Sequence, residues 1–521
     1  SRQGTAFQHP PASLPVVPRS LAMWSWSDFG LMRDALLAAK LEHVLMALAV
    51  LGASFLCRRR RTSSFGGCGA DVSLLAEGDW NKAAPRYTFP EEVPRCVGDW
   101  QGVERIGSYQ KVGRAKSCEF YQLPSAMPTE DVARILDHVK HKAAYSVDSD
   151  SVDSCPTFEY YPFRAGSWTD EALRRLLSTF IDDRLLPYVR ERYSCKSAAL
   201  ADILVRRYVP GERRTHAVHF DGQALVTGIF GLCDPCEYEG GLYVQPEAHG
   251  SSRMFFRIEP GDLLVHSFDL QHGVFVWSGV RYSMVFWIKD STESVRKNTS
   301  PWYDSMARDG DADAMFNIAQ DFELGMCGRP FDLKSAETFY QKSADMGHHF
   351  AQYSLSKLLY TAHRHDADPQ GRARAAFWLR KSAEQGFALA QKDFALALVG
   401  GQGVEEDAVQ AAAWMRRAAE QLDLEAACYL GEFLAEGLGA AGAADLRAAA
   451  RWYGRSAEGG FPEAQYELGM MCLQGQGVPW DADKARYWLG CAAKQGHRKA
   501  AKEVGRLTTV SPRKRSPRKV K

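Results

Sequence analysis

The sequence predicts a multidomain chain in which an all-β region is followed by an all-α solenoid of helix-pair repeats. Between residues 200 and 290, seven short apolar runs are separated mostly by Gly, Pro or Asp, which is typical of a β-sandwich, barrel or jelly roll. Between 310 and 507, segments of 36 to 39 residues repeat in one register. The length of 521 residues is compatible with this organisation, because it allows about three to five domains.

The composition excludes several classes of protein. Hydrophobic residues make up 45% and charged residues 24%, which excludes a mainly disordered chain, a collagen-like chain and a polytopic membrane protein. Lys and Arg number 64 against 63 Asp and Glu, so the net charge of +1 argues against nucleic acid as a partner of the whole protein. Twelve cysteines are too dilute for a small disulfide scaffold, and no four of them have zinc-finger spacing.

The N-terminal region, residues 1–111, is predicted to be disordered apart from an apolar helix over 35–57. The uninterrupted apolar run, Val44–Cys57, is 14 residues long, and Arg58–Arg61 follows it directly. A bilayer-spanning helix needs about 20 apolar residues, so both a membrane anchor and an amphipathic or buried helix remain open. The positive-inside rule would place the arginines in the cytosol.

The C-terminal segment, residues 508–521, is predicted to be a basic disordered tail. Its last eleven residues contain six basic side chains, no acidic ones and two Ser-Pro steps, so they cannot bury apolar area. Nuclear localisation, contact with phosphate groups and a merely solvated tail are the three interpretations of this segment.

The repeats carry alanines and aromatic residues at fixed positions. Each unit has an Ala four residues after its start, and an aromatic residue lies eight residues before the next start. Small residues let two helices approach closely, and the aromatic fills the space between neighbours. The alanines are Ala314, Ala351, Ala390, Ala426, Ala464 and Ala500, and the aromatics are Phe339, Trp378, Trp414, Trp452 and Trp488.

This pattern resembles the Sel-one-like repeats, relatives of the tetratricopeptide repeat, over nearly all of 310–507. The resemblance implies a solenoid that contacts protein partners along a concave face. The second repeat departs from the family's loop pattern. Its residues His363, His365, Asp366 and Asp368 are interpreted either as a metal site or as an exposed polar loop.

The all-β region contains a set of metal-ligand residue types. His219 and Asp221 are two residues apart, and on a strand residues i and i+2 share one face. With 14 histidines in the chain, about one such pair is expected by chance. A second histidine, His272, follows Asp221 by 51 residues and would complete a facial triad of two histidines and one carboxylate. Arg281 lies nine residues further along the chain, and its guanidinium can bind a carboxylate through two parallel hydrogen bonds.

The ordered set of motifs resembles the Fe(II)- and 2-oxoglutarate-dependent dioxygenases, in particular the prolyl 4-hydroxylase group. The resemblance implies a double-stranded β-helix, or jelly-roll, domain over 112–292, with helices within Thr129–Lys142 and Thr169–Tyr193 packed on it. The matching elements are Arg207–Gly211, His219–Asp221, Gly240–Gly241, Gly261–Leu263, His272–Val274 and Gly279–Ser283.

The resemblance also implies a role for each residue. His219, Asp221 and His272 would hold Fe(II), Arg281 would pair with the distal carboxylate of 2-oxoglutarate, and Tyr208 would add a hydrogen bond. O₂ and ascorbate complete the expected cofactors. The expected reaction is hydroxylation of proline in a protein or peptide substrate, with the repeats binding protein partners.

Several alternatives stay open. The spacing of nine residues between His272 and Arg281 resembles that of the oxygen-sensing branch of the family. Collagen-type members use Lys at a slightly longer spacing. The substrate residue is therefore undecided. A surface salt bridge for Arg281 and a packed strand residue for Tyr208 are the alternative roles. His216 and His266 are excluded as ligands, because His216 is outside the His-x-Asp register and His266 lacks an Arg nine residues on. Cys233 and Cys236 are interpreted as redox-active, as structural or as joined in a local disulfide.

Other functions are also compatible with the sequence. The chain could be a repeat scaffold with an inactive oxygenase domain, an oxygenase for a substrate other than proline, or a nucleic-acid demethylase, which only the basic tail suggests. The resemblance favours the endoplasmic reticulum membrane or lumen, with the cytosol or nucleus as alternatives.

Overall fold

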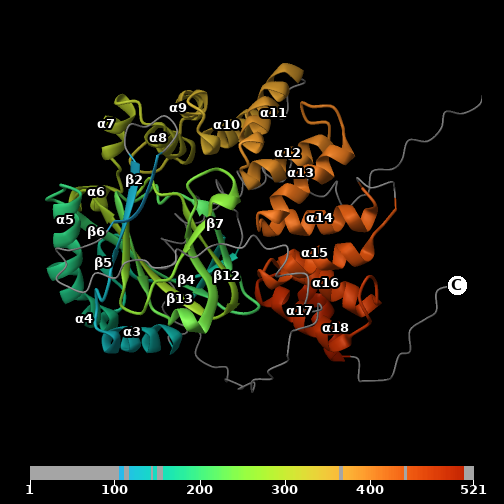
Figure 1. Ribbon diagram of the computed structural model, residues 1–521, viewed down its shortest axis with the longest axis horizontal. Helices are drawn as coiled ribbons and strands as arrows, with labels where there is room; N and C mark the ends of the chain where they lie inside the picture. The colour runs from blue at the N-terminus through green and yellow to red at the C-terminus, as the bar shows by residue number, and fades with distance from the viewer. Residues whose placement is uncertain are drawn as a thin grey trace, which may run out of the picture. The chain divides into compact units, whose positions relative to one another are not determined.

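The computed structural model describes the chain from residue 105 to residue 509 with five gaps (Figure 1). The described ranges are 105–110, 117–141, 145–149, 156–362, 368–438 and 443–509. The predicted anchor over 35–57 and residues 510–521 of the predicted tail lie outside them, as do His363, His365 and Asp366. No helix within the described ranges is long and apolar enough to cross a membrane.

The strands all lie before residue 290. They are β1 (Arg105–Gln110), β2 (Ser117–Leu123), β3 (Ser146–Ser149), β4 (Pro156–Arg164), β5 (Ser167–Trp168), β6 (Ala199–Tyr208), β7 (Thr215–His219), β8 (Val226–Gly231), β9 (Tyr238–Val244), β10 (Met254–Phe256), β11 (Leu263–Ser267), β12 (His272–Gly279) and β13 (Arg281–Lys289).

The helices fall into two groups. Those among the strands are α3 (Thr129–His141), α4 (Glu171–Phe180), the π-helical turn η3 (Ile181–Leu185), α5 (Leu186–Arg192) and the short turns η4 (Pro235–Glu237) and η5 (Gly250–Ser252). Those that follow are α6 (Thr292–Lys297), α7 (Trp302–Arg308), α8 (Ala312–Leu324), α9 (Leu333–Asp345), α10 (His349–Ala362), α11 (Pro369–Glu384), α12 (Ala388–Val399), α13 (Ala408–Glu420), α14 (Leu424–Glu436), α15 (Leu446–Glu458), α16 (Pro462–Gln474), α17 (Ala482–Lys494) and α18 (Arg498–Thr509).

The strands form two antiparallel sheets. The large sheet has the order β1-β2-β11-β8-β13-β6-β4-β3, with β5 paired to β4. The small sheet has the order β10-β9-β12-β7. All seven apolar runs predicted between 200 and 290 contribute to strands. The strand β7 is not among these seven runs, because its sequence, Thr-His-Ala-Val-His, contains only two apolar residues.

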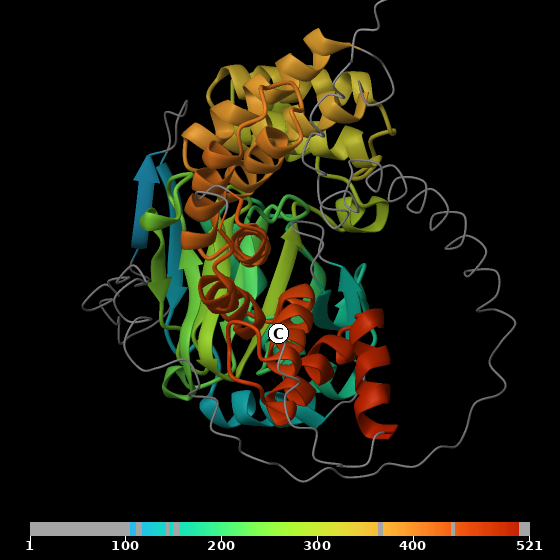
Figure 2. The ribbon, with the colours of Figure 1, turned by 90° about the vertical axis from the view of Figure 1, so that its right-hand side faces the viewer.

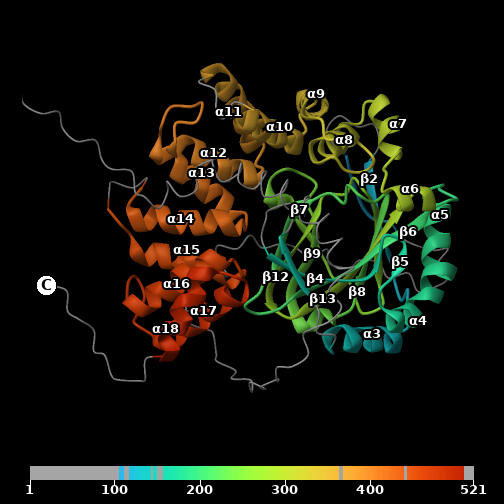
Figure 3. The same cartoon turned by 180° about the vertical axis from the view of Figure 1, so that it is seen from behind.

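The large sheet has an apolar core on each face. One core packs α3, α4 and α5 against residues such as Met284 and Phe286 of β13. Figures 1 and 3 show α4 and α5 along this sheet. The other core joins Ile229 and Leu264 to Leu242 of the small sheet. The predicted helices within 129–142 and 169–193 therefore cover the face of the large sheet that is turned away from the small sheet.

The C-terminal part is a helical repeat solenoid, as predicted. Each helix from α8 to α18 contacts the next, and Figure 2 shows them following in order through yellow, orange and red. The six predicted alanines at the start of each unit are 0% exposed, so these positions are closely packed. The turn before α16 needs glycine at Gly460, where φ is +95° and an added Cβ would collide with the carbonyl oxygen of Glu212.

Glutamines of the repeats bind two loops of the β-sheet region. The side-chain oxygen of Gln421 accepts a hydrogen bond of 2.6 Å from the backbone N–H of Gly250. The side-chain amides of Gln465 and Gln495 donate to the backbone oxygen of Gly211 at 3.4 and 3.3 Å. The backbone of these loops is thereby satisfied by repeat side chains rather than by water.

The repeats also contact the segment that carries two of the predicted metal ligands. Phe220 packs against Phe316 of α8 and Phe350 of α10, with ring centroids 6.1 and 5.1 Å apart. The hydroxyl of Tyr303 in α7 donates a hydrogen bond of 2.6 Å to the backbone oxygen of Gly222. The position of this segment therefore depends on side chains of the helical part.

The Phe220→Ala variant should bind divalent cations more weakly. Removing the ring frees the segment between the predicted ligands, and loss of such outer support typically costs roughly tenfold in metal affinity. Titration of Mn(II) into the full chain measures the effect. Phe331→Ala is the control, because Phe331 is 57% exposed. Equal affinities in Phe220→Ala and Phe331→Ala would show that the contact does not support the site.

The Glu458→Gln variant should be more stable than the wild type at pH 8 and similar to it at pH 4. Burial raises the pKa of Glu458 to about 7, against the opposing effect of Arg214 and Arg455. The folded state therefore holds this proton more tightly than the unfolded state, whose value is 4.5, and the wild type loses stability as pH rises from 4.5 through 7. The gain at pH 8 should be about 1–2 kcal/mol, measured by denaturant unfolding. A gain that is the same at both pH values would contradict this assignment.

Candidate metal centre

His219 and His272 are brought together by strand pairing. His219 is the last residue of β7 and His272 the first of β12, and the two are direct partners in the small sheet. Asp221 lies two residues beyond the end of β7, so the prediction that it shares a strand with His219 is wrong. The chain turns at this point, and the backbone N–H of Ala224 donates to the backbone oxygen of Asp221 at 3.0 Å.

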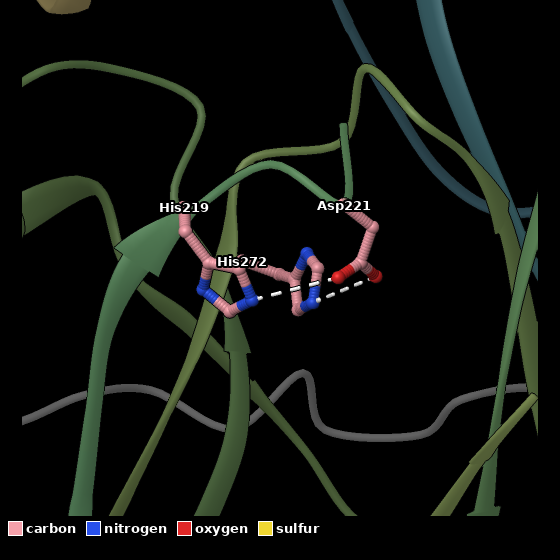
Figure 4. Close-up of side chains that lie close together, drawn as sticks. All are labelled: His219, Asp221 and His272. Carbon is pink, nitrogen blue, oxygen red and sulfur yellow. Dashed lines mark ion pairs between the residues drawn. The ribbon is translucent and has the colours of Figure 1, made fainter. Parts of the chain in front are cut away.

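The three side chains converge on one point (Figure 4). Nε2 of His219 lies 3.7 Å from Oδ1 of Asp221, and Nε2 of His272 lies 3.5 Å from Oδ2. One ligand atom from each residue lies within 4.8 Å of the other two. Two imidazole nitrogens and one carboxylate oxygen are the donor set of a facial triad, which leaves other coordination positions open.

Backbone carbonyls orient both imidazoles. Nδ1 of His219 lies 2.8 Å from the oxygen of Ala217, and Nδ1 of His272 lies 3.1 Å from the oxygen of Leu270. A carbonyl oxygen can only accept a hydrogen bond, so Nδ1 carries the proton of each neutral ring. Each Nε2 therefore presents a lone pair towards Asp221, as a metal ligand must.

The electrostatics keep Asp221 and His272 deprotonated at neutral pH. Burial alone raises the pKa of the Asp221 carboxyl, but His272, His219 and His266 outweigh it and hold the pKa well below its ordinary value. Burial lowers the pKa of His272 to about 3. The site thus combines the Asp221 carboxylate with a neutral His272 imidazole, the protonation states that metal binding requires.

Two further histidines lie close to the three. His266, excluded from the site on sequence grounds, is 0% exposed, and its Nε2 lies 3.9 Å from Oδ2 of Asp221. Burial lowers the pKa of His266. The ring of His216 packs against that of His219, with centroids 4.0 Å apart. Strand alternation could have revealed His266, because Leu264, two residues earlier, also faces the small sheet.

Arg281 is buried beside Tyr208. It is the first residue of β13, pairs in register with Tyr208 of β6, and is 3% exposed. Its Nη1 donates to the hydroxyl of Ser283 at 3.1 Å, and its guanidinium lies 5.5 Å from the centre of the Tyr208 ring. The contacts of Arg281 within the described ranges are with Ser283, Tyr208 and Tyr238, and none of them is an ion pair, so it is not part of a surface salt bridge there. A buried guanidinium without a carboxylate partner is costly unless an anion binds to it.

The inner face of the large sheet carries other polar atoms that lack hydrogen-bond partners. Tyr282 and Phe286 of β13 belong to the helix-side core, so alternation places Arg281 and Trp287 on the opposite face, towards the small sheet. Oγ1 of Thr227 and Nε1 of Trp287 are buried without a hydrogen-bond partner. A polar ligand could bond to these atoms, whereas apolar side chains could not.

The two cysteines of the Cys-x-x-Cys segment are free thiols. Cys233 is buried, accepts a hydrogen bond of 3.2 Å from the backbone N–H of Tyr282, and has a pKa raised by burial. Cys236 is exposed, and its hydrogen bond with Asp234 raises its pKa. A raised pKa makes a thiol a poorer nucleophile, so these observations favour the structural interpretation.

Some solved structures are similar to the helical part of the chain, and others are similar to its β-sheet part. The protective antigen c5321 of uropathogenic Escherichia coli is 29% identical over 40% of this chain, with a TM-score of 0.37, and this chain spans 43% of that protein. A 2OG-Fe(II) oxygenase family oxidoreductase from Burkholderia pseudomallei is 17% identical over 34% of this chain and 87% of its own, with a TM-score of 0.28. A Pseudomonas putida prolyl-4-hydroxylase is 14% identical over 33% and 91%, with a TM-score of 0.27.

Five consecutive segments of the solenoid match the Sel1 repeat family. The matched residues are 312–348, 349–387, 388–421, 424–461 and 462–497. The helical part of the chain is therefore built from Sel1 repeats, a type of repeat that generally mediates protein–protein interactions.

Proposed function

We propose that the chain is an Fe(II)- and 2-oxoglutarate-dependent dioxygenase that hydroxylates a protein substrate, with proline as the favoured residue. The observation that carries the proposal is the pairing of a buried donor set, His219, Asp221 and His272, with a buried Arg281 that has no carboxylate partner. In this proposal the two sheets form a double-stranded β-helix, the domain extends over 112–292, and the Sel1 repeats bind protein partners.

The residues of the metal centre fit a ferrous ion. Oδ2 of Asp221 is buried and has no hydrogen-bond partner, although the carboxylate is charged. His219 and His272 direct lone pairs at the same point and cannot donate to it. A cation held by these three residues would compensate the buried charge and leave positions open for other ligands. When bound, iron and 2-oxoglutarate supply the oxidising chemistry, in which O₂ converts the keto acid to succinate and CO₂ while a substrate C–H bond is hydroxylated.

Arg281 would bind the distal carboxylate of 2-oxoglutarate. A guanidinium offers two parallel N–H donors to a carboxylate, and burial strengthens that ion pair because water does not compete. The ring of Tyr208 limits the movement of the guanidinium from one side, and Ser283 holds one of its nitrogens.

The surroundings of the site are largely apolar. Ile229 and Leu264 of the large sheet and Leu242 and Val274 of the small sheet are buried in one apolar core. Fixed dipoles in such surroundings act more strongly on charge than they do in water.

Proline as the substrate residue and ascorbate as a reductant rest on the resemblance of the ordered motifs to the prolyl 4-hydroxylase group.

The full chain supplied with Fe(II), 2-oxoglutarate, ascorbate and a proline-rich peptide should form succinate. His219→Ala should abolish this turnover because the variant loses one of the three metal ligands. His141→Ala is the matched control, since His141 is an exposed histidine on α3, and it should retain wild-type activity. Turnover by His219→Ala at the wild-type rate would overturn the proposal, and turnover with other peptides alone would overturn the assignment to proline.

Arg281→Leu should raise the KM for 2-oxoglutarate at least tenfold and leave the affinity for Mn(II) within about threefold of the wild type. The loss of a charge-assisted bidentate pair is worth about 1.5–3 kcal/mol. Arg281→Lys should restore part of the affinity for 2-oxoglutarate, because Lys keeps the positive charge but cannot donate two parallel hydrogen bonds. A parallel loss of metal affinity and 2-oxoglutarate affinity would show instead that Arg281 supports the fold of the site.

A further inference from the structure

His266 places a third imidazole at the metal centre from the opposite sheet. It lies on β11 of the large sheet and is 0% exposed, whereas His219 and His272 belong to the small sheet. The rings of His266 and His272 have centroids 4.6 Å apart, and Nε2 of His266 lies 3.9 Å from Oδ2 of Asp221. The Asp221 carboxylate therefore faces imidazole nitrogens from both sheets.

The free nitrogen of His266 is a hydrogen-bond acceptor. Its Nδ1 lies 2.8 Å from the backbone oxygen of Ser267, which can only accept, so Nδ1 carries the proton of the neutral ring. Nε2 is left with a lone pair that faces Oδ2 of Asp221, and both atoms are buried without a hydrogen-bond partner. Two acceptors cannot bond to each other, and leaving both unsatisfied costs free energy.

The separation of the two acceptors suits a bridging water molecule. A water oxygen about 2.8 Å from each of two acceptors spans roughly 4 Å between them, close to the observed 3.9 Å. The alternative is direct coordination by His266. However, the set of ligand atoms that lie within 4.8 Å of one another comprises His219, Asp221 and His272 and does not include His266.

We propose that His266 is a positioning residue that holds a water molecule against Oδ2 of Asp221 and so fixes the carboxylate beside the metal. This inference rests on the proposed metal centre. Hydrogen bonds to a ligating carboxylate determine its orientation, and their loss typically lowers metal affinity 10- to 100-fold.

The test compares two variants of the full chain that differ in one respect. His266→Phe keeps an aromatic ring but removes the acceptor, whereas His266→Gln keeps an acceptor oxygen. His349→Phe, which replaces a buried histidine of α10, is the control for loss of an imidazole elsewhere. Mn(II) affinity is measured from the signal of the free ion in electron paramagnetic resonance, and the nitrogens coordinated to Cu(II) are counted from their hyperfine coupling.

The expected result is an Mn(II) Kd about tenfold higher in His266→Phe, within about threefold of the wild type in His266→Gln and His349→Phe, and two coordinated nitrogens throughout. Unchanged affinity in His266→Phe would overturn the inference, and so would the loss of a coordinated nitrogen, because His266 would then be a ligand. If His266→Phe does not fold, the test is the Mn(II) affinity of His266→Gln. A Kd more than tenfold above that of the wild type would then overturn the inference. A wild type that binds no Mn(II) would overturn the proposed metal centre itself.

Discussion

The buried carboxylate of Asp221 is the constraint on which the rest of the site depends. It is 3% exposed and charged, and the nearest polar groups are nitrogens of His219, His272 and His266 that present lone pairs rather than protons. Such a carboxylate is very costly without a cation. Three features arrange donors around that charge. They are the pairing of β7 with β12, the backbone carbonyls that fix each ring and the inward position of β11.

The helical part contributes to the same constraint. Phe220, between two of the proposed ligands, packs on aromatic rings of α8 and α10, and Gly222 accepts a hydrogen bond from Tyr303 of α7. A partner that shifts these helices would also shift the segment that carries Asp221. The repeats therefore have a structural connection to the proposed chemistry in addition to their general role in binding proteins.

The sequence predicted the parts of the structure that depend on local pattern. The repeats were found because their alanines and aromatics recur at fixed spacing, and the strands after residue 200 because apolar runs alternate with turns. The three residues that the sequence predicts as metal ligands lie close together in the structure, and their role as ligands stays a prediction. These features need no knowledge of how distant segments pack.

The features that were missed depend on packing between distant segments. Asp221 lies beyond the end of the strand, and its neighbours Phe220 and Gly222 contact the helices, which the His-x-Asp pattern does not show. His266 was excluded because it has no Arg nine residues on, yet it meets Asp221 because the two sheets face each other. Strands β1 to β5 were not predicted either, since they join the large sheet through the pairing of β2 with β11 and of β4 with β6, which are distant in the sequence.

The most direct test of the account is anaerobic addition of Fe(II) and then 2-oxoglutarate to the full chain, followed by visible absorption. A keto acid that chelates ferrous iron produces a charge-transfer band that neither component shows alone. The band should appear in the wild type at one iron per chain and be absent from Asp221→Ala. An iron-loaded wild type without the band, or a band that persists in Asp221→Ala, would contradict the proposed metal centre.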